Sequence, residues 1–435
     1  MNKIFNKITF LSLLIVVSYF LGFLINENSA GAGGYKGDIS WILKNIDIFK
    51  NNSIYNSIFH PDLFGNRTPL IYIINKLLNP YFYDYEKYRI TVFLLSLTGS
   101  IFFFLCLKIK NKNTNSNLLI LLSTIILLSP FYRTSGFWGL NENYGLVATI
   151  ISLTSLNYFL EKLNTNNKNN IYFYLTILFS SACVYFDQKL VIVPLITLFT
   201  ILFSVIKFRY KIYSCLIFFL FTLPYVALIY KWGGLVPPLT QLENPNAVTN
   251  LSRVVNLYII NVGYACTLIA FYLLPLLFFK EESLIDLIRR KRKNYLIYLV
   301  PLVYIFFLLL SFDFKAFTVD NYWVGLGYVH KSSLILFNDI RYQEIFTYFS
   351  FFVSWIVIAL YVDKNFLDYL IIAFFLVLSL FIWPLIQEYF DPIIIILFFL
   401  IPTKNLQIRS TNSIFITLYL CVFLIIANVY YLGKV

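Results

Sequence analysis

Asp38 is the first residue of this sequence whose position suggests catalysis. It follows an apolar segment (residues 8–26) and a glycine-rich stretch (residues 31–37). We expect a half-amphipathic helix from Asp38 onward, because apolar residues recur there at helical spacing: Trp41, Ile42, Ile46 and Phe49. A carboxylate here could be a general base that takes a proton from an attacking hydroxyl group. Asp38 could instead only cap the helix that it begins.

A second acidic candidate, Asp62, lies near His60 and Arg67 in the stretch FHPDLFGNRTPLIYIINKL. Proline and glycine residues break the chain here, and the apolar run that follows is too short to span a bilayer. The pattern predicts an interfacial or re-entrant helix. The three polar side chains could line a cleft above this helix, and an ordinary solvated turn is the alternative.

Three later polar segments carry further candidates. Arg133 is an isolated cation among aromatic residues, which indicates either a ligand contact or an anchor at the membrane interface. Gly233 and Gly234 precede two prolines and predict a tight turn that lets backbone approach a ligand or another helix, with a solvated connection as the alternative. Arg341 and Glu388 lie in polar segments near the end of the chain, where a solvated connection is the alternative.

The composition shows what kind of scaffold must position these residues. Of 435 residues, 59% are hydrophobic and 13% are charged, with a mean hydropathy of +0.75. Soluble domains carry about 25% charged residues, so the balance excludes a soluble enzyme, a nucleic-acid binder and a secreted disulfide module. The five cysteines all lie in apolar runs and are expected to be small core residues. Two histidines exclude a His-rich metal site.

Thirteen apolar segments are candidates to cross the bilayer, so the sequence predicts an all-α polytopic protein with one integral membrane domain over residues 1–435. The segments are 8–26, 90–107, 117–130, 144–160, 171–186, 190–206, 212–230, 257–279, 295–312, 346–362, 367–384, 392–402 and 413–432. With a cytoplasmic amino terminus, 19 of the 34 Lys and Arg residues fall in the short inner segments, at about three times the outer density. The run 289–293 is then a cytoplasmic topology anchor, and the long first loop, residues 27–89, is extracytoplasmic. The short loops favour a bacterial inner membrane over an endoplasmic reticulum membrane.

The predicted spans contain few ionisable residues. Asp187 and Lys189 lie in a tight outer turn, and Asp368 lies at an inner end. Ion-coupled carriers place more charge inside their spans, and we find no internal repeat of the kind that many transporters show. Both observations argue against secondary transport.

The order of these segments resembles the GT-C glycosyltransferases, and within them the dolichyl-phosphate-glucose-dependent alpha-1,2-glucosyltransferase family of N-glycan precursor assembly. Six stretches are similar to motifs of that family along almost the whole chain. They are Gly37-Asp38-Ile39, His60-Pro61-Asp62 with Thr68-Pro69-Leu70-Ile71-Tyr72, Pro130–Thr134, Asp187-Gln188-Lys189, Lys231–Val236 and Pro384–Phe390. The chain departs from the family in lacking a second carboxylate beside Asp38 and in having an aromatic residue where a late arginine stands.

The resemblance implies an inverting transfer of a hexose from a polyprenyl-phosphate sugar to a lipid-linked or surface glycan on the extracytoplasmic face. Asp38 is the implied base, and Asp62 is the second choice. Because the late arginine is replaced, the phosphate must bind another cation: Arg133, Lys189, Lys231 or Arg341. The full implied substrate site is His60, Arg67, Arg133, Gln188, Lys189, Lys231, Trp232, Gly233, Gly234, Arg341 and Glu388. A divalent metal is not implied, because the acids do not cluster at ligand spacing.

Two other functions stay open. A flippase for lipid-linked glycans would need a polar or cationic central cavity, which the spans do not supply. A surface-polysaccharide polymerase would be expected to carry several arginines in one late outer loop, where this chain has Arg341 alone.

Overall fold

Helices make up the regular structure of the computed structural model, which describes residues 2–30, 38–65, 67–164, 171–243, 257–316, 326–362, 365–382, 385–402 and 406–432. The glycine-rich stretch 31–37, expected to be a flexible lead into Asp38, lies outside these ranges. The chain packs as two units, Met1–Ser252 with Ile396–Val435 and Arg253–Ile395. Each unit is described below by itself.

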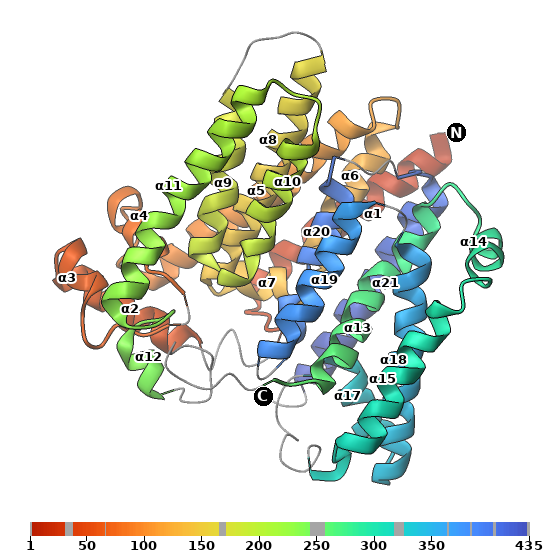
Figure 1. Cartoon of the computed structure of the whole chain (residues 1–435). Helices are drawn as coiled ribbons and strands as arrows, with labels where there is room; N and C mark the ends of the chain where they lie inside the picture. The colour runs from red at the N-terminus through yellow and green to blue at the C-terminus, as the bar shows by residue number, and fades with distance from the viewer. Residues whose placement is uncertain are drawn as a thin grey trace. The chain divides into compact units, whose positions relative to one another are not determined.

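The first unit begins with a long helix, a polar connection and a series of packed helices (Figure 1). Its elements are α1 (Asn2–Leu24), α2 (Asp38–Asn51), α3 (Ile54–Ile58), α4 (Leu70–Leu78), α5 (Tyr85–Lys110), α6 (Ser116–Thr124), η2 (Ile125–Leu128), α7 (Pro130–Phe137), α8 (Asn141–Asn164), α9 (Ile171–Phe186), η3 (Gln188–Val191), α10 (Ile192–Phe203), α11 (Phe208–Trp232), α12 (Pro238–Glu243) and α21 (Ser410–Leu432). The helices α5, α8 and α9 pack side by side and form its core.

The second unit is built around α13, which packs against α18 and α19. Its elements are α13 (Ile260–Leu273), η4 (Pro275–Phe279), α14 (Leu284–Lys291), α15 (Leu296–Ser311), α17 (Gly327–Leu336), α18 (Ile340–Tyr361), α19 (Phe366–Phe381) and η5 (Gln387–Tyr389). The short helix α20 (Ile393–Leu400) runs across the boundary between the two units in the sequence.

Within the described residues, seven helices are long and apolar enough to cross a membrane, and two bent helix pairs raise this number to nine. Three shorter apolar helices, Ile171–Phe186, Gln188–Phe203 and Phe366–Phe381, add to them. The protein is therefore an integral, multi-pass membrane protein. Each of the thirteen expected segments coincides with one of these helices or pairs, or with α20. That all thirteen cross the bilayer stays a prediction.

The surfaces of α11 and α15 show why the sequence is so apolar. Both helices expose long apolar side chains along most of their length, including Phe219 and Leu220 on α11 and Phe306 on α15. Water would disfavour such surfaces, whereas lipid tails solvate them. Cys215 is also exposed on α11, so the expectation that all five cysteines are core residues is wrong for this one.

The first loop forms helices where the sequence predicts them. The helix α2 starts at Asp38 and buries the predicted apolar face of Ile42, Ile46 and Phe49. The apolar run after Pro69 forms α4, which is nine residues long. Lys76 on α4 donates to the backbone carbonyls of Phe49 and Asn52 at the end of α2, so the two short helices are joined.

Candidate functional site

The first loop is held together by Asn45 on α2. Its side-chain amide donates to the Phe64 carbonyl (2.6 Å) and the Tyr72 hydroxyl (3.1 Å), and its oxygen accepts from the Phe64 amide (3.2 Å). Trp41 stacks on Phe64 with ring centroids 3.6 Å apart. These contacts fix the segment that carries Asp62 and Arg67 against the helix that begins at Asp38.

Three charged side chains influence the pKa of the Tyr72 phenol. Burial raises the pKa of its phenol to about 12, and the hydrogen bond from Asn45 opposes this rise. Arg67 also lowers the pKa, whereas Glu142 and Asp38 raise it. Asp38, Arg67 and Glu142 therefore all lie within electrostatic reach of one hydroxyl group, although they are far apart in the sequence.

Arg67 forms an ion pair with Glu142, in the first turn of α8. The Glu142 side chain is only 2% exposed, whereas Arg67 is 21% exposed. The carboxylate thus holds a guanidinium that stays partly exposed to solvent. On either side of Glu142, the amide oxygens of Asn141 and Asn143 are buried and accept no hydrogen bond from the described residues.

Arg133 has a different environment. A bend of 70° at Ser129 and Pro130 starts α7 and directs Arg133 into the interior, where its side chain is 2% exposed. Glu27 accepts from its Nε (2.8 Å) and Nη2 (2.5 Å), and Ser18 and Leu127 accept its other hydrogen bonds. The five N–H donors of the guanidinium therefore all have acceptors. Arg133 is not the isolated cation that the sequence predicts, because Glu27 pairs with it from 106 residues away.

Segments from three other parts of the first unit reach the first loop. The Thr68 hydroxyl donates to the Tyr185 carbonyl at the end of α9 (2.5 Å). The Trp232 indole donates to the Ile58 carbonyl (3.3 Å). The Thr240 hydroxyl on α12 accepts from the Gly65 amide (2.9 Å).

The turn after α11 makes the last of these contacts possible. The helix ends at Gly233, which has a left-handed backbone with φ of 70°. A residue without a side chain adopts this conformation at little cost. The chain then returns as α12, and Gln241 donates to the carbonyls of Trp232 (3.1 Å) and Val236 (2.7 Å). The predicted tight turn is confirmed.

The other predicted residues of the first unit divide between interior and surface. Lys189 is buried against Asp187 (3.0 Å) and lies over the Phe131 ring, and Gln188 donates to the Leu235 carbonyl (3.1 Å). Lys231 and Asp62 are exposed. His60 accepts from the Asp62 amide through Nδ1 (3.2 Å).

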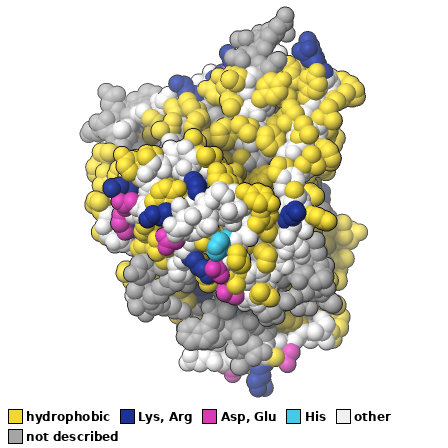
Figure 2. Space-filling model, turned by 90° about the vertical axis from the view of Figure 1, so that its left-hand side faces the viewer, with side chains coloured by type: hydrophobic (Ala, Val, Ile, Leu, Met, Phe, Trp, Pro, Cys, Tyr) yellow, Lys and Arg dark blue, Asp and Glu magenta, His cyan; other side chains and the backbone are white. Residues whose placement is uncertain are grey.

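On the face that carries α2 to α4, charged side chains of both signs gather in one area, beside a largely hydrophobic surface (Figure 2).

Arg341 and Glu388 belong to the second unit, where Arg341 is exposed at the start of α18 and Glu388 lies in η5.

Sequence reasoning missed Glu27, Glu142, Asn45 and Tyr72. Glu27 and Glu142 did carry a signal, since each is an acid at the end of a predicted span. Among the described residues, no three His, Cys, Asp or Glu side chains lie together as metal ligands.

No protein-family model, no curated protein and no solved structure matches this chain.

Proposed function

We propose that this protein is a membrane glycosyltransferase, which moves a hexose from a polyprenyl-phosphate sugar to a lipid-linked or surface glycan on the extracytoplasmic face of a bacterial inner membrane. The observation that carries the proposal is the grouping of Asp38, Arg67 and Glu142 around Tyr72. A carboxylate and a partly exposed arginine thus act on one hydroxyl group. Such a pair fits the two chemical needs of sugar transfer from a lipid phosphate.

Asp38 is the base in this proposal. Its carboxylate takes the proton of the acceptor hydroxyl while the hydroxyl oxygen attacks the anomeric carbon. The bond between that carbon and the phosphate oxygen breaks, and the polyprenyl phosphate leaves with the electron pair. Attack from the side opposite the leaving group inverts the configuration at the anomeric carbon.

Arg67 is the phosphate anchor in this proposal, in place of Arg133. A guanidinium binds phosphate through charge-assisted hydrogen bonds, which strengthen as charge develops on the leaving phosphate. Arg133 would have to leave Glu27 to do so. The buried Glu142 carboxylate keeps Arg67 oriented.

The test is an assay of purified protein in lipid nanodiscs with a panel of polyprenyl-phosphate sugars and release of polyprenyl phosphate as the readout. We expect Asp38→Asn to lower kcat by about 10²–10⁴-fold, the usual contribution of a general base. Asp62→Asn should cost clearly less. Asp47→Asn, an exposed acid on the same helix, is the matched control and should behave as wild type.

Three outcomes would contradict parts of the proposal. Wild-type activity of Asp38→Asn would remove Asp38 from the mechanism. A large loss in Asp62→Asn alone would make Asp62 the base. Translocation of a lipid-linked glycan in proteoliposomes, without release of polyprenyl phosphate from any donor, would favour the flippase.

A further inference from the structure

The short helix α14 in the second unit meets α15 at an angle of 74°. The α15 segment exposes apolar side chains along its length, as a helix in contact with lipid does. If α15 crosses the bilayer, α14 lies close to the plane of the membrane surface. Ile285 on α14 is 63% exposed, and Ile288 is exposed as well. A helix with this orientation and exposed isoleucines is suited to the membrane interface.

The carboxyl end of α14 is rich in positive charge. Arg289 and Arg290 pair with Asp286 (3.7 Å) and Glu282 (2.7 Å), respectively. The last two cations of the run, Arg292 and Lys293, are exposed. No ion pair is seen for Arg292 or Lys293 among the described residues.

Neighbouring lysines fix this basic end to α18. Lys291 donates to the Val362 carbonyl (2.8 Å), and Lys280 donates to the Leu360 carbonyl (3.3 Å). These bonds satisfy carbonyls at the carboxyl end of α18, where cations are favourable. Arg292 and Lys293 are thereby held at a defined place, directly before α15 begins.

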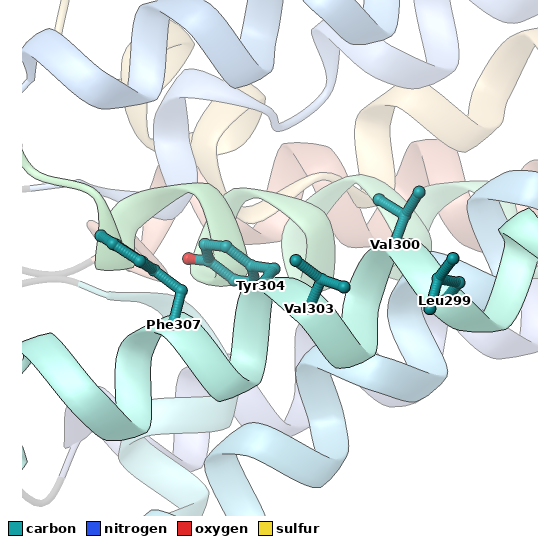
Figure 3. A pocket seen from close by; sticks show the side chains of 5 residues that line it. All are labelled: Leu299, Val300, Val303, Tyr304 and Phe307. Carbon is teal, nitrogen blue, oxygen red and sulfur yellow. The ribbon is translucent and has the colours of Figure 1, made fainter.

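An open apolar groove on α15 starts at Leu299, six residues after Lys293 in the sequence (Figure 3). It has a volume of about 440 Å³ and is lined by Leu299, Val300, Val303, Tyr304 and Phe307, which share one face of α15. The Tyr304 hydroxyl donates to the Ile259 carbonyl (2.8 Å) and accepts from the Gly263 amide (2.9 Å), so the middle of the groove is fixed. The lining residues extend over about 12 Å of helix at 1.5 Å per residue.

We propose that the second unit binds an anionic phospholipid, with its headgroup phosphate on Arg292 and Lys293 and one acyl chain along the α15 groove. Positive charge beside an apolar groove complements an anionic headgroup with its attached chain. A free phosphate ion would leave the groove and the exposed isoleucines unused. A polyprenyl phosphate donor is disfavoured because the positive-inside rule places this basic run on the cytoplasmic side, opposite the proposed sugar transfer.

Native mass spectrometry of the full-length protein in mild detergent tests this proposal. The probes are dioleoylphosphatidylglycerol, dioleoylphosphatidylcholine and a polyprenyl monophosphate, each titrated separately. We expect the phosphatidylglycerol to bind most tightly. R292Q/K293Q should weaken its binding at least about tenfold, since each cation near a lipid surface contributes substantially, and should leave phosphatidylcholine binding unchanged.

Two further variants complete the test. Val303→Trp places a large side chain in the groove at a position that is 57% exposed, and should weaken phosphatidylglycerol binding while the thermal melting of the protein stays unchanged. K207Q/K211Q removes two cations at the start of α11 in the first unit and should have no effect. Equal binding of the two phospholipids, tighter binding of the polyprenyl monophosphate, or wild-type binding by Val303→Trp would overturn the proposal.

Discussion

Two arginines of the first unit pair with a glutamate far away in the sequence, and the two pairs differ in their access to solvent. Arg133 and Glu27 are 2% and 9% exposed, and every N–H of Arg133 has an acceptor within the protein. Arg67 is 21% exposed beside a Glu142 that is 2% exposed. The presence of an ion pair therefore does not show whether it serves stability or binding, and the solvent access of its partners helps to decide. A pair in which both side chains are buried stabilises the fold, whereas a pair with one partly exposed side chain can also bind a ligand.

The largest expected effect is on stability. Arg133→Ala should lower the free energy of unfolding by about 3–5 kcal/mol, because it leaves the Glu27 carboxylate buried without its cation. Denaturant or thermal unfolding of the purified protein measures this change. If Arg133→Ala melts like wild type but loses donor binding, the pair is not buried as described, and Arg133 again becomes a candidate phosphate ligand.

The second effect is on ligand binding. R67A/E142Q removes the arginine without leaving a buried carboxylate, and should weaken polyprenyl-phosphate binding about 10–100-fold, since hydrogen bonds to charged groups contribute about 1.5–3 kcal/mol. Titration of a polyprenyl monophosphate into nanodiscs that contain the protein measures the loss. Arg67→Lys should retain part of the affinity, because it keeps the charge but not the planar donor set. Unchanged affinity in R67A/E142Q would make this pair structural as well.

The smallest effect concerns the hydrogen bond between α12 and the first loop, on which Arg67 lies. Thr240→Val removes the hydrogen bond between Thr240 and Gly65 and should destabilise the loop locally by about 0.5–1.5 kcal/mol. Faster hydrogen exchange in peptides that contain Gly65 would show it. Thr222→Val on α11 is the control, because Thr222 is exposed and donates to the Phe219 carbonyl of its own helix. Equal exchange in the two variants would mean that α12 does not hold the loop.

The sequence by itself determined the class of protein and the places of its long apolar helices. Long apolar runs cannot be solvated by water, and helices are the structures that satisfy the backbone of such runs in lipid. The helical spacing of Ile42, Ile46 and Phe49 predicted α2. The glycines and prolines near Gly233 predicted the turn there. These features depend on local chemistry, which the order of residues contains.

Only the tertiary structure decided which charges meet. Glu27 reaches Arg133 across 106 residues, and Glu142 reaches Arg67 across 75. Local patterns carry no information about such partners, because the bend at Pro130 and the packing of α8 against the first loop bring them together. The family resemblance therefore implied Arg133 as one of four candidate phosphate ligands, in place of the missing late arginine. The burial of its guanidinium against Glu27 favours a structural role instead, because a ligand would have to displace a carboxylate that solvent barely reaches.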